Sequence, residues 1–150
     1  PADHEGFAGG SAGCKSYRHR SQDPVRPSDG NPRQMKRQLA EKSGREGEAR
    51  AALWLRVKGW RILDKRVKTP AGEIDLVAKR GDLIAFVEVK WRRKAADLDH
   101  AIDEYRLSRV AAAAETIAHR YIEGHEDIRI DVILLAPGTF PRHIANAWQP

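Results

Sequence analysis

The sequence predicts an α/β fold in which helices flank a central mixed β-sheet. One observation is a pair of short runs, residues 73–79 and 83–90, in which polar and apolar side chains alternate on either side of an Arg-Gly-Asp turn. The other is a helical pattern before and after these runs, followed by a β-rich run over residues 128–135. The order helix, three strands, helix, strand is that of a sandwich of helices on a sheet.

The first helix is expected over residues 45–58. Ser43 and Glu46 have the capping-box spacing, which favours a helix start here, and Gly59 is a typical residue just beyond a helix end. The short apolar segment at residues 60–63 then indicates a first strand, ahead of the two alternating runs.

The second helix is expected over residues 98–121, where apolar residues recur at helical spacing without proline or glycine. A fourth strand follows at residues 128–135 and is ended by Pro137 and Gly138. Residues 143–148 favour a short strand at the edge of the sheet.

The chain divides by composition near residue 34. Residues 1–34 are rich in Gly, Ser, Pro and Arg and contain few large apolar residues, which predicts disorder. The one methionine is Met35, and we interpret it as the natural start, with residues 1–34 a dispensable or mis-assigned leader. Residues 35–150 are then expected to form a single domain.

Composition limits the class of protein. The formal net charge is +6, which favours a polyanionic partner. The sequence has no apolar run of transmembrane length and no signal-peptide pattern at its N-terminus. The single cysteine, Cys14, excludes a disulfide framework and a cysteine-based zinc site. A cytoplasmic location is therefore expected.

The two alternating runs place charged side chains on one face of a hairpin. Only a register that sets Leu76 opposite Val87 keeps the apolar residues together, because a shift by one residue would bury charges among them. That register brings Asp75 beside Glu88 on the other face, and Lys90 follows two residues later on the same side.

Adjacent carboxylates need something to offset their repulsion. Two of them about 4 Å apart repel by roughly 4 kcal/mol at an effective dielectric constant of about 20. A shared proton, a basic neighbour or a bound cation can offset this, and hard oxygen ligands suit Mg²⁺ or Mn²⁺. Lys90 could then orient a water molecule or stabilise charge on a phosphate. The alternative is an exposed hairpin in which Asp75 and Lys90 form an ion pair.

Further candidates lie close to this hairpin. Glu48 shares a helical face with Ala51 and Leu55, so its carboxylate could point into the same cluster; alternatively it is an exposed glutamate that favours the helix start. Basic residues before and after the hairpin are candidates to contact nucleic-acid phosphates, and Trp91 to stack on a base or to serve in packing. These candidates are Lys65, Arg66, Arg92, Arg93 and Lys94.

The motifs resemble a known nuclease superfamily. Asp75 followed by Glu88-Val-Lys90 after a hairpin resembles the PD-(D/E)XK, restriction-endonuclease-like and Holliday-junction-resolvase-like superfamily, with its αβββαβ core. The motifs Gly-Glu at 47–48, Gly-Glu-Ile-Asp-Leu at 72–76, Phe-Val-Glu-Val-Lys at 86–90 and Arg-Ile-Asp-Val at 129–132 are similar to those of the YraN-type endonuclease-like family. The resemblance extends from about residue 44 to the C-terminus.

The resemblance implies a set of site residues. A Mg²⁺ or Mn²⁺ ion would be bound by Asp75, Glu88 and the backbone carbonyl of Val89, and Lys90 would orient water or stabilise charge. Glu48 matches the acidic residue of the first helix and is a further catalytic and metal-ligand candidate.

This chain departs from the pattern at two positions. Ile74 stands where the superfamily name has proline, and Arg106 aligns where the family often has lysine, which leaves the role of Arg106 open. Arg129 and Asp131 match a late Arg-x-Asp pattern, which we interpret as structural support or backbone contact.

Three functions from different classes remain. The leading hypothesis is a metal-dependent endonuclease acting on DNA, with branched DNA as a candidate substrate. By analogy with junction-cutting relatives, it would be a homodimer. The second is a nucleic-acid-binding module that keeps the nuclease fold with weak or no catalysis. The third is a structural or interaction protein with an ion-paired hairpin, which would not bind DNA in a salt-dependent way.

Overall fold

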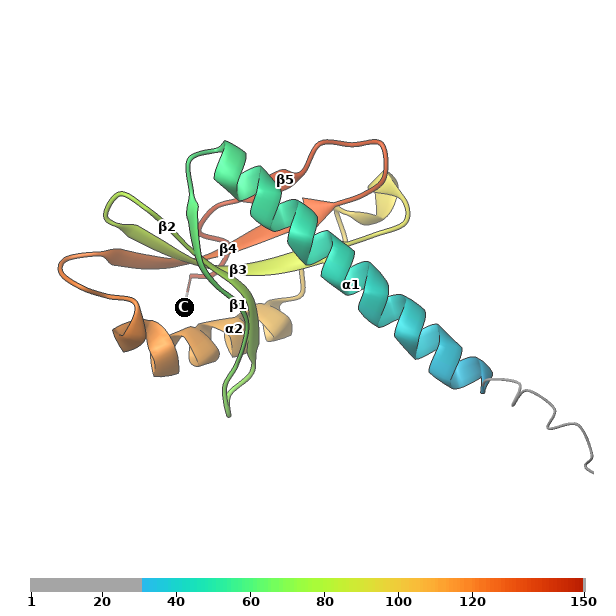
Figure 1. The fold of residues 1–150 in the computed structure, drawn as a ribbon, viewed down its shortest axis with the longest axis horizontal. Helices are drawn as coiled ribbons and strands as arrows, with labels where there is room; N and C mark the ends of the chain where they lie inside the picture. The colour runs from blue at the N-terminus through green and yellow to red at the C-terminus, as the bar shows by residue number, and fades with distance from the viewer. Residues whose placement is uncertain (1–30, 150) are drawn as a thin grey trace, which may run out of the picture. The chain divides into compact units, whose positions relative to one another are not determined.

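The computed structural model describes residues 31–149, and the predicted α/β fold class is confirmed there. The elements are α1 (Pro32–Val57), β1 (Arg61–Lys68), β2 (Glu73–Arg80), β3 (Leu83–Trp91), η1 (Ala95–Asp97), α2 (Glu104–Ile117), η2 (Ala118–Arg120), β4 (Asp127–Leu135) and β5 (Arg142–Ile144). The five strands form a sheet in the order β1-β2-β3-β4-β5 (Figure 1). Only the β3–β4 pair is parallel, so the described sheet is mixed, as the restriction-endonuclease-like core requires.

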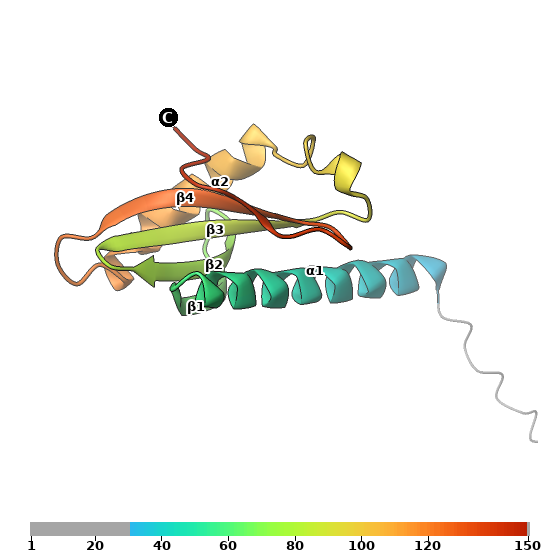
Figure 2. The ribbon, with the colours of Figure 1, turned by 90° about the horizontal axis from the view of Figure 1, so that it is seen from above.

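The two helices cover opposite faces of the sheet. Figure 2 shows α1 along one face and α2 on the other, with the strands between them. Because the parallel pair β3–β4 needs a crossover, the chain leaves the sheet after β3 and returns at β4 by way of α2. No helix within residues 31–149 is long and apolar enough to cross a membrane.

Helix α1 begins well before the predicted residue 45. Asn31 caps the helix, because its side-chain oxygen accepts a hydrogen bond from the backbone amide of Arg33 at 3.0 Å. Pro32 occupies the first turn, where a backbone N–H has no partner within the helix and its loss costs nothing. Ser43, predicted to be the cap, lies inside the helix with its hydroxyl donating to the Leu39 carbonyl at 2.9 Å. The predicted leader therefore overlaps this helix at residues 32–34, and its remainder, residues 1–30, lies outside the described part of the chain.

The other element boundaries differ in smaller ways. Gly59, at φ +84°, follows the end of α1 as predicted. The first strand is longer than residues 60–63, and the edge strand is shorter than residues 143–148. Helix α2 starts at Glu104 rather than at 98, because Asp103 accepts the amides of the next turn and acts as its N-cap.

The predicted hairpin register is confirmed between β2 and β3, where Leu76 pairs with Val87 and Ala78 with Ala85. One part of the facial assignment is wrong. Strand alternation predicts Ile74 on the same face as Leu76 and Ala78, but Ile74 packs into the core under α2 whereas they pack under α1.

The reason lies in where the two strands separate. Strand β2 pairs with β3 only from Leu76 onward, and before that it continues with β1 alone. The free end of the β1–β2 hairpin curves toward α2, as Figure 1 shows. At Gly72 a Cβ atom would come within 3.2 Å of the Arg109 carbonyl oxygen, so this glycine permits close contact with α2. Asp75 lies at the point of separation.

Candidate active site

Asp75, Glu88 and Lys90 come together where β2 separates from β3. Asp75 Oδ2 accepts a hydrogen bond from the backbone amide of Val89 at 2.7 Å, which ties its carboxylate to the residue after Glu88. Lys90 Nζ lies 2.8 Å from Glu88 Oε1. The predicted juxtaposition of these three side chains is therefore present, and the alternative ion pair between Asp75 and Lys90 is replaced by one between Glu88 and Lys90.

Arg106 also belongs to this cluster, although its role was left open from the sequence. Its Nε donates to Glu88 Oε1 at 2.9 Å from the first turns of α2. The signal was present in the sequence pattern, because Arg106 lies four and seven residues before Val110 and Ala113, which are buried against the sheet. A basic residue on an apolar helical stripe indicates a buried anionic partner.

Glu88 is the most deeply buried member of the cluster, at 2% exposed. Lys90 and Arg106 both contact its Oε1 atom, but Oε2 is buried without a hydrogen-bond partner. An unpaired oxygen of a buried carboxylate costs free energy. A cation bound to this oxygen would satisfy it, so the residues present fit a metal ion.

The raised pKa of Asp75 also favours a cation at this site. Burial raises its pKa to about 7, with the charge of Glu88 adding to the rise and the Val89 amide opposing it. A bound cation would favour the ionised form and return the pKa toward its ordinary range. The pKa of Arg106 is raised, first by its hydrogen bond to Glu88, so this guanidinium stays charged.

Glu48 lies beside this cluster but has a different partner. Its Oε2 is 3.6 Å from Arg66 Nε, and its pKa is raised, chiefly by burial. Among residues 31–149 no group of three Asp, Glu, His or Cys side chains could hold a metal ion by itself. A metal in this arrangement would rest on the two carboxylates of Asp75 and Glu88 together with a backbone carbonyl.

The basic candidates separate into two groups. Lys65 and Arg66 were expected in a loop but lie within β1, and Arg66 is held near Glu48 and Glu73. Arg92 and Arg93 directly follow β3 and line a groove together with Lys90.

Of the remaining two candidates, Trp91 lines this groove and Lys94 does not. Trp91 packs on α1 at Gly47, where an added Cβ would stand 3.4 Å from the Trp91 Cβ, so packing is one of its roles. Lys94 is exposed and precedes η1, outside the groove lining.

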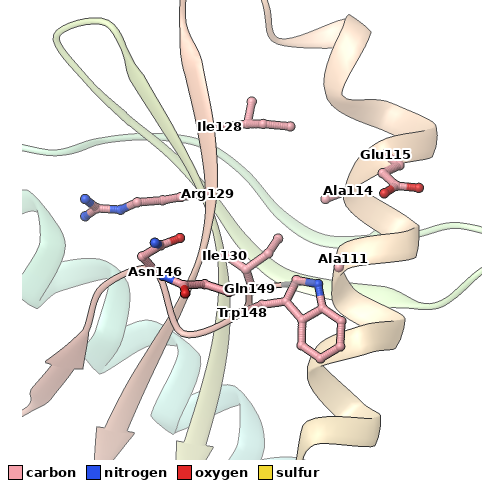
Figure 3. A pocket seen from close by; sticks show the side chains of 9 residues that line it. All are labelled: Ala111, Ala114, Glu115, Ile128, Arg129, Ile130, Asn146, Trp148 and Gln149. Carbon is pink, nitrogen blue, oxygen red and sulfur yellow. The ribbon is translucent and has the colours of Figure 1, made fainter.

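A second hollow of about 390 Å³ lies between α2, β4 and the C-terminal segment (Figure 3). Its lining is largely apolar, with Ala111, Ala114, Ile130 and Trp148 around it, and Glu115 and Arg129 are its charged residues. Asp75, Glu88 and Lys90 do not line it. The carboxylate cluster at the β2–β3 separation is therefore the better candidate for chemistry.

The comparisons with known proteins all point to one family. The model of the uncharacterised protein family UPF0102 matches residues 47–135, which include the whole carboxylate cluster. A UPF0102 protein of Erythrobacter litoralis is 80% identical over 116 residues, covering 77% of this chain and 100% of that relative. Those of Sphingopyxis alaskensis and Caulobacter vibrioides strain NA1000 are 60% and 46% identical, each over 77% of this chain and over 100% and 94% of the relative. The YraN-type resemblance is confirmed: the chain belongs to the uncharacterised protein family UPF0102.

Proposed function

We propose that this protein is a DNA endonuclease that depends on Mg²⁺ or Mn²⁺. The observation that supports this most is the buried, unpaired Oε2 of Glu88 beside Asp75, whose pKa is raised to about 7. Lys90 and Arg106 contact only Oε1 of Glu88, so a cation would still be needed to satisfy Oε2. A buried carboxylate with a perturbed pKa, such as Asp75, is typical of functional sites.

Each residue has a distinct part in the proposed reaction. Asp75, Glu88 and the carbonyl of Val89 would hold the ion, which when bound activates water and stabilises charge on the phosphate. Lys90 donates hydrogen bonds from a charged amine, suited to orient the attacking water or to stabilise the phosphate oxygens. Water attacks phosphorus as the bond to the leaving sugar oxygen breaks on the opposite side. Water gives up a proton and the leaving oxygen gains one, so the products are a terminal phosphate and a free hydroxyl.

Arg106 is assigned a positioning role in this scheme. By donating to Oε1 of Glu88 it fixes the carboxylate and leaves Oε2 directed to the cation. Glu48 is a further ligand candidate, and its ion pair with Arg66 would have to open for it to serve. A homodimer remains a prediction.

The second candidate function is a nucleic-acid-binding module with weak or no catalysis. It is favoured because no group of three metal-binding side chains comes together within residues 31–149 and because Glu48 is engaged with Arg66. The two functions differ in what Asp75 does. In the enzyme its loss abolishes cleavage, whereas in the module it leaves DNA binding nearly unchanged.

The test uses the full chain with fluorescent single-stranded, duplex, flap and four-way-junction DNA, each with Mg²⁺, Mn²⁺ or EDTA. Wild-type protein is expected to cut at least one substrate with metal and none with EDTA. Asp75→Ala and Lys90→Ala are expected to abolish cutting, whereas Asp82→Ala, at an exposed turn, retains it. Binding that persists in all variants, with no cutting by the wild type, would favour the module.

A further inference from the structure

A groove of about 390 Å³ runs between the N-terminal half of α1 and the end of β3. Among the described residues, ten line it, of which four are basic and none is acidic. They are Lys36, Leu39, Ala40, Ser43, Gly44, Val89, Lys90, Trp91, Arg92 and Arg93. The groove is therefore a cationic channel with apolar patches, a combination that suits a nucleic-acid strand.

The α1 wall of the groove has little contact with the core. Every residue from Pro32 to Lys42 is exposed, and in Figure 2 this half of the helix extends past the edge of the sheet. Met35 and Leu39 are 55% and 57% exposed. Helices usually gain most of their stability from packing an apolar face, so this half is placed for contact with something other than the core.

The groove begins at the proposed active site. Lys90, whose Nζ contacts Glu88 Oε1, is also one of its lining residues, and Arg92 and Arg93 follow directly. A strand that passes Lys90 would meet Lys36 on the opposite wall. Four cationic side chains thus line one groove, and one of them, Lys90, also contacts the carboxylate cluster.

We propose that this groove binds the single-stranded segment of a DNA substrate, so that the substrate class is DNA with a single-stranded branch or end. This inference rests on the proposed endonuclease function. A volume of about 390 Å³ suits a group of about nucleotide size and is too small to enclose the cross-section of a double helix. The basic residues would neutralise phosphates, and Leu39 and Trp91 offer apolar surface to a base.

The test of the groove measures how tightly the full chain binds a labelled single-stranded oligonucleotide. Fluorescence anisotropy reports the binding, in EDTA and over a series of salt concentrations. Lys36→Ala and Arg93→Ala are each expected to weaken binding roughly fivefold, the equivalent of one phosphate contact. Each should reduce the slope of log affinity against log salt by about 0.7, the single-strand value. Lys42→Ala, an exposed lysine on the same helix outside the groove, is the matched control and should change neither.

Two results would overturn the proposal: equal weakening by Lys36→Ala and Lys42→Ala, or a duplex of the same sequence that binds as tightly and depends equally on Lys36. Cleavage separates this failure from failure of the endonuclease function. If the wild type cuts and Lys36→Ala cuts flap DNA as fast as the wild type does, the groove assignment fails alone. If the wild type does not cut but the groove variants lose single-strand binding, the endonuclease function fails alone.

Discussion

Two buried carboxylate clusters in this sheet differ in how completely they are satisfied. Asp131 on β4 is 0% exposed, and both of its oxygens have partners. The Asn146 amide donates to Oδ1 at 2.9 Å, while His143 Nε2 at 2.7 Å and Arg129 Nη2 at 3.0 Å contact Oδ2. Glu88 on the neighbouring strand is buried almost as deeply but has one oxygen without a partner.

The pKa values of Asp131 and Asp75 shift in opposite directions, because the two carboxylates have different neighbours. Burial raises the pKa of Asp131, but the hydrogen bonds from His143, the Asn146 amide and Arg129 together outweigh it, so its net pKa is lowered. At Asp75 burial and the charge of Glu88 act in the same direction, and the pKa rises to about 7. A carboxylate that is buried and satisfied stabilises a fold, whereas one that is buried and incomplete is suited to bind a cation.

The largest expected effect separates the two clusters by stability. Asp131→Asn removes the charge that faces Arg129 inside the protein and should lower the free energy of unfolding by about 3 kcal/mol. Asp75→Asn relieves repulsion with Glu88 and should leave stability unchanged or raised. Urea denaturation at pH 8 measures both. Equal losses in the two variants would contradict the distinction.

The next effect is the response to metal. Mg²⁺ at about 100 times its dissociation constant should raise the unfolding free energy of the wild type by about 2.7 kcal/mol, because only the folded site binds it. Asp75→Asn should lose this response and Asp82→Asn should keep it, as thermal unfolding with Mg²⁺ or EDTA would show. A full response in Asp75→Asn would place any metal elsewhere.

The sequence predicted the parts of this site that depend on strand periodicity. The register that joins Asp75 to Glu88 follows from keeping Leu76 and Val87 in the core, since a slip of one residue would bury charges. Asp75, Glu88 and Lys90 are close together for that reason alone.

Features that depend on how elements are placed in space could not be predicted in the same way. The contact of Arg106 with Glu88 requires α2 to be docked on β3, and no local pattern gives that position. The displacement of Ile74 into the other core depends on where β2 leaves β3. The early start of α1 was missed because a local capping pattern at Ser43 competed with the actual cap at Asn31.

A smaller effect tests the partner of Glu88. Arg106→Ala leaves Oε1 with Lys90 alone and should cost about 1.5 kcal/mol of unfolding free energy, the lower end of the usual range for a hydrogen bond to a charged group, because the Arg106 side chain is 33% exposed. Arg109→Ala on the same helix, which gives up only a 3.3 Å contact with the Ala71 carbonyl, should cost less. If Arg109→Ala costs more in chemical denaturation, Arg106 is not the residue that holds Glu88.

The smallest expected effect uses a third carboxylate, Glu126, as a reference for pH dependence. Its hydrogen bond with Lys79, followed by backbone amides including that of Gly124, lowers its pKa to about 2. A lowered pKa in the folded state means that stabilisation is present above the ordinary value of 4.5 and is lost as the pH falls toward 2. The melting temperature of the wild type should therefore exceed that of Glu126→Gln at pH 6, and the gap should close by about pH 2.

Asp75→Asn should show the opposite sign. A raised pKa in the folded state means that ionisation of Asp75 destabilises the fold as the pH rises from about 4 to about 7. The melting temperature of Asp75→Asn should therefore rise relative to that of the wild type over that interval. Melting curves in metal-free buffer between pH 2 and 8 would record both trends. The opposite result would be a wild type that melts above Asp75→Asn at neutral pH, with the difference in melting temperature closing on acidification as it does for Glu126→Gln. Asp75 would then already be satisfied within the fold. The difference between the clusters on β3 and β4 would disappear.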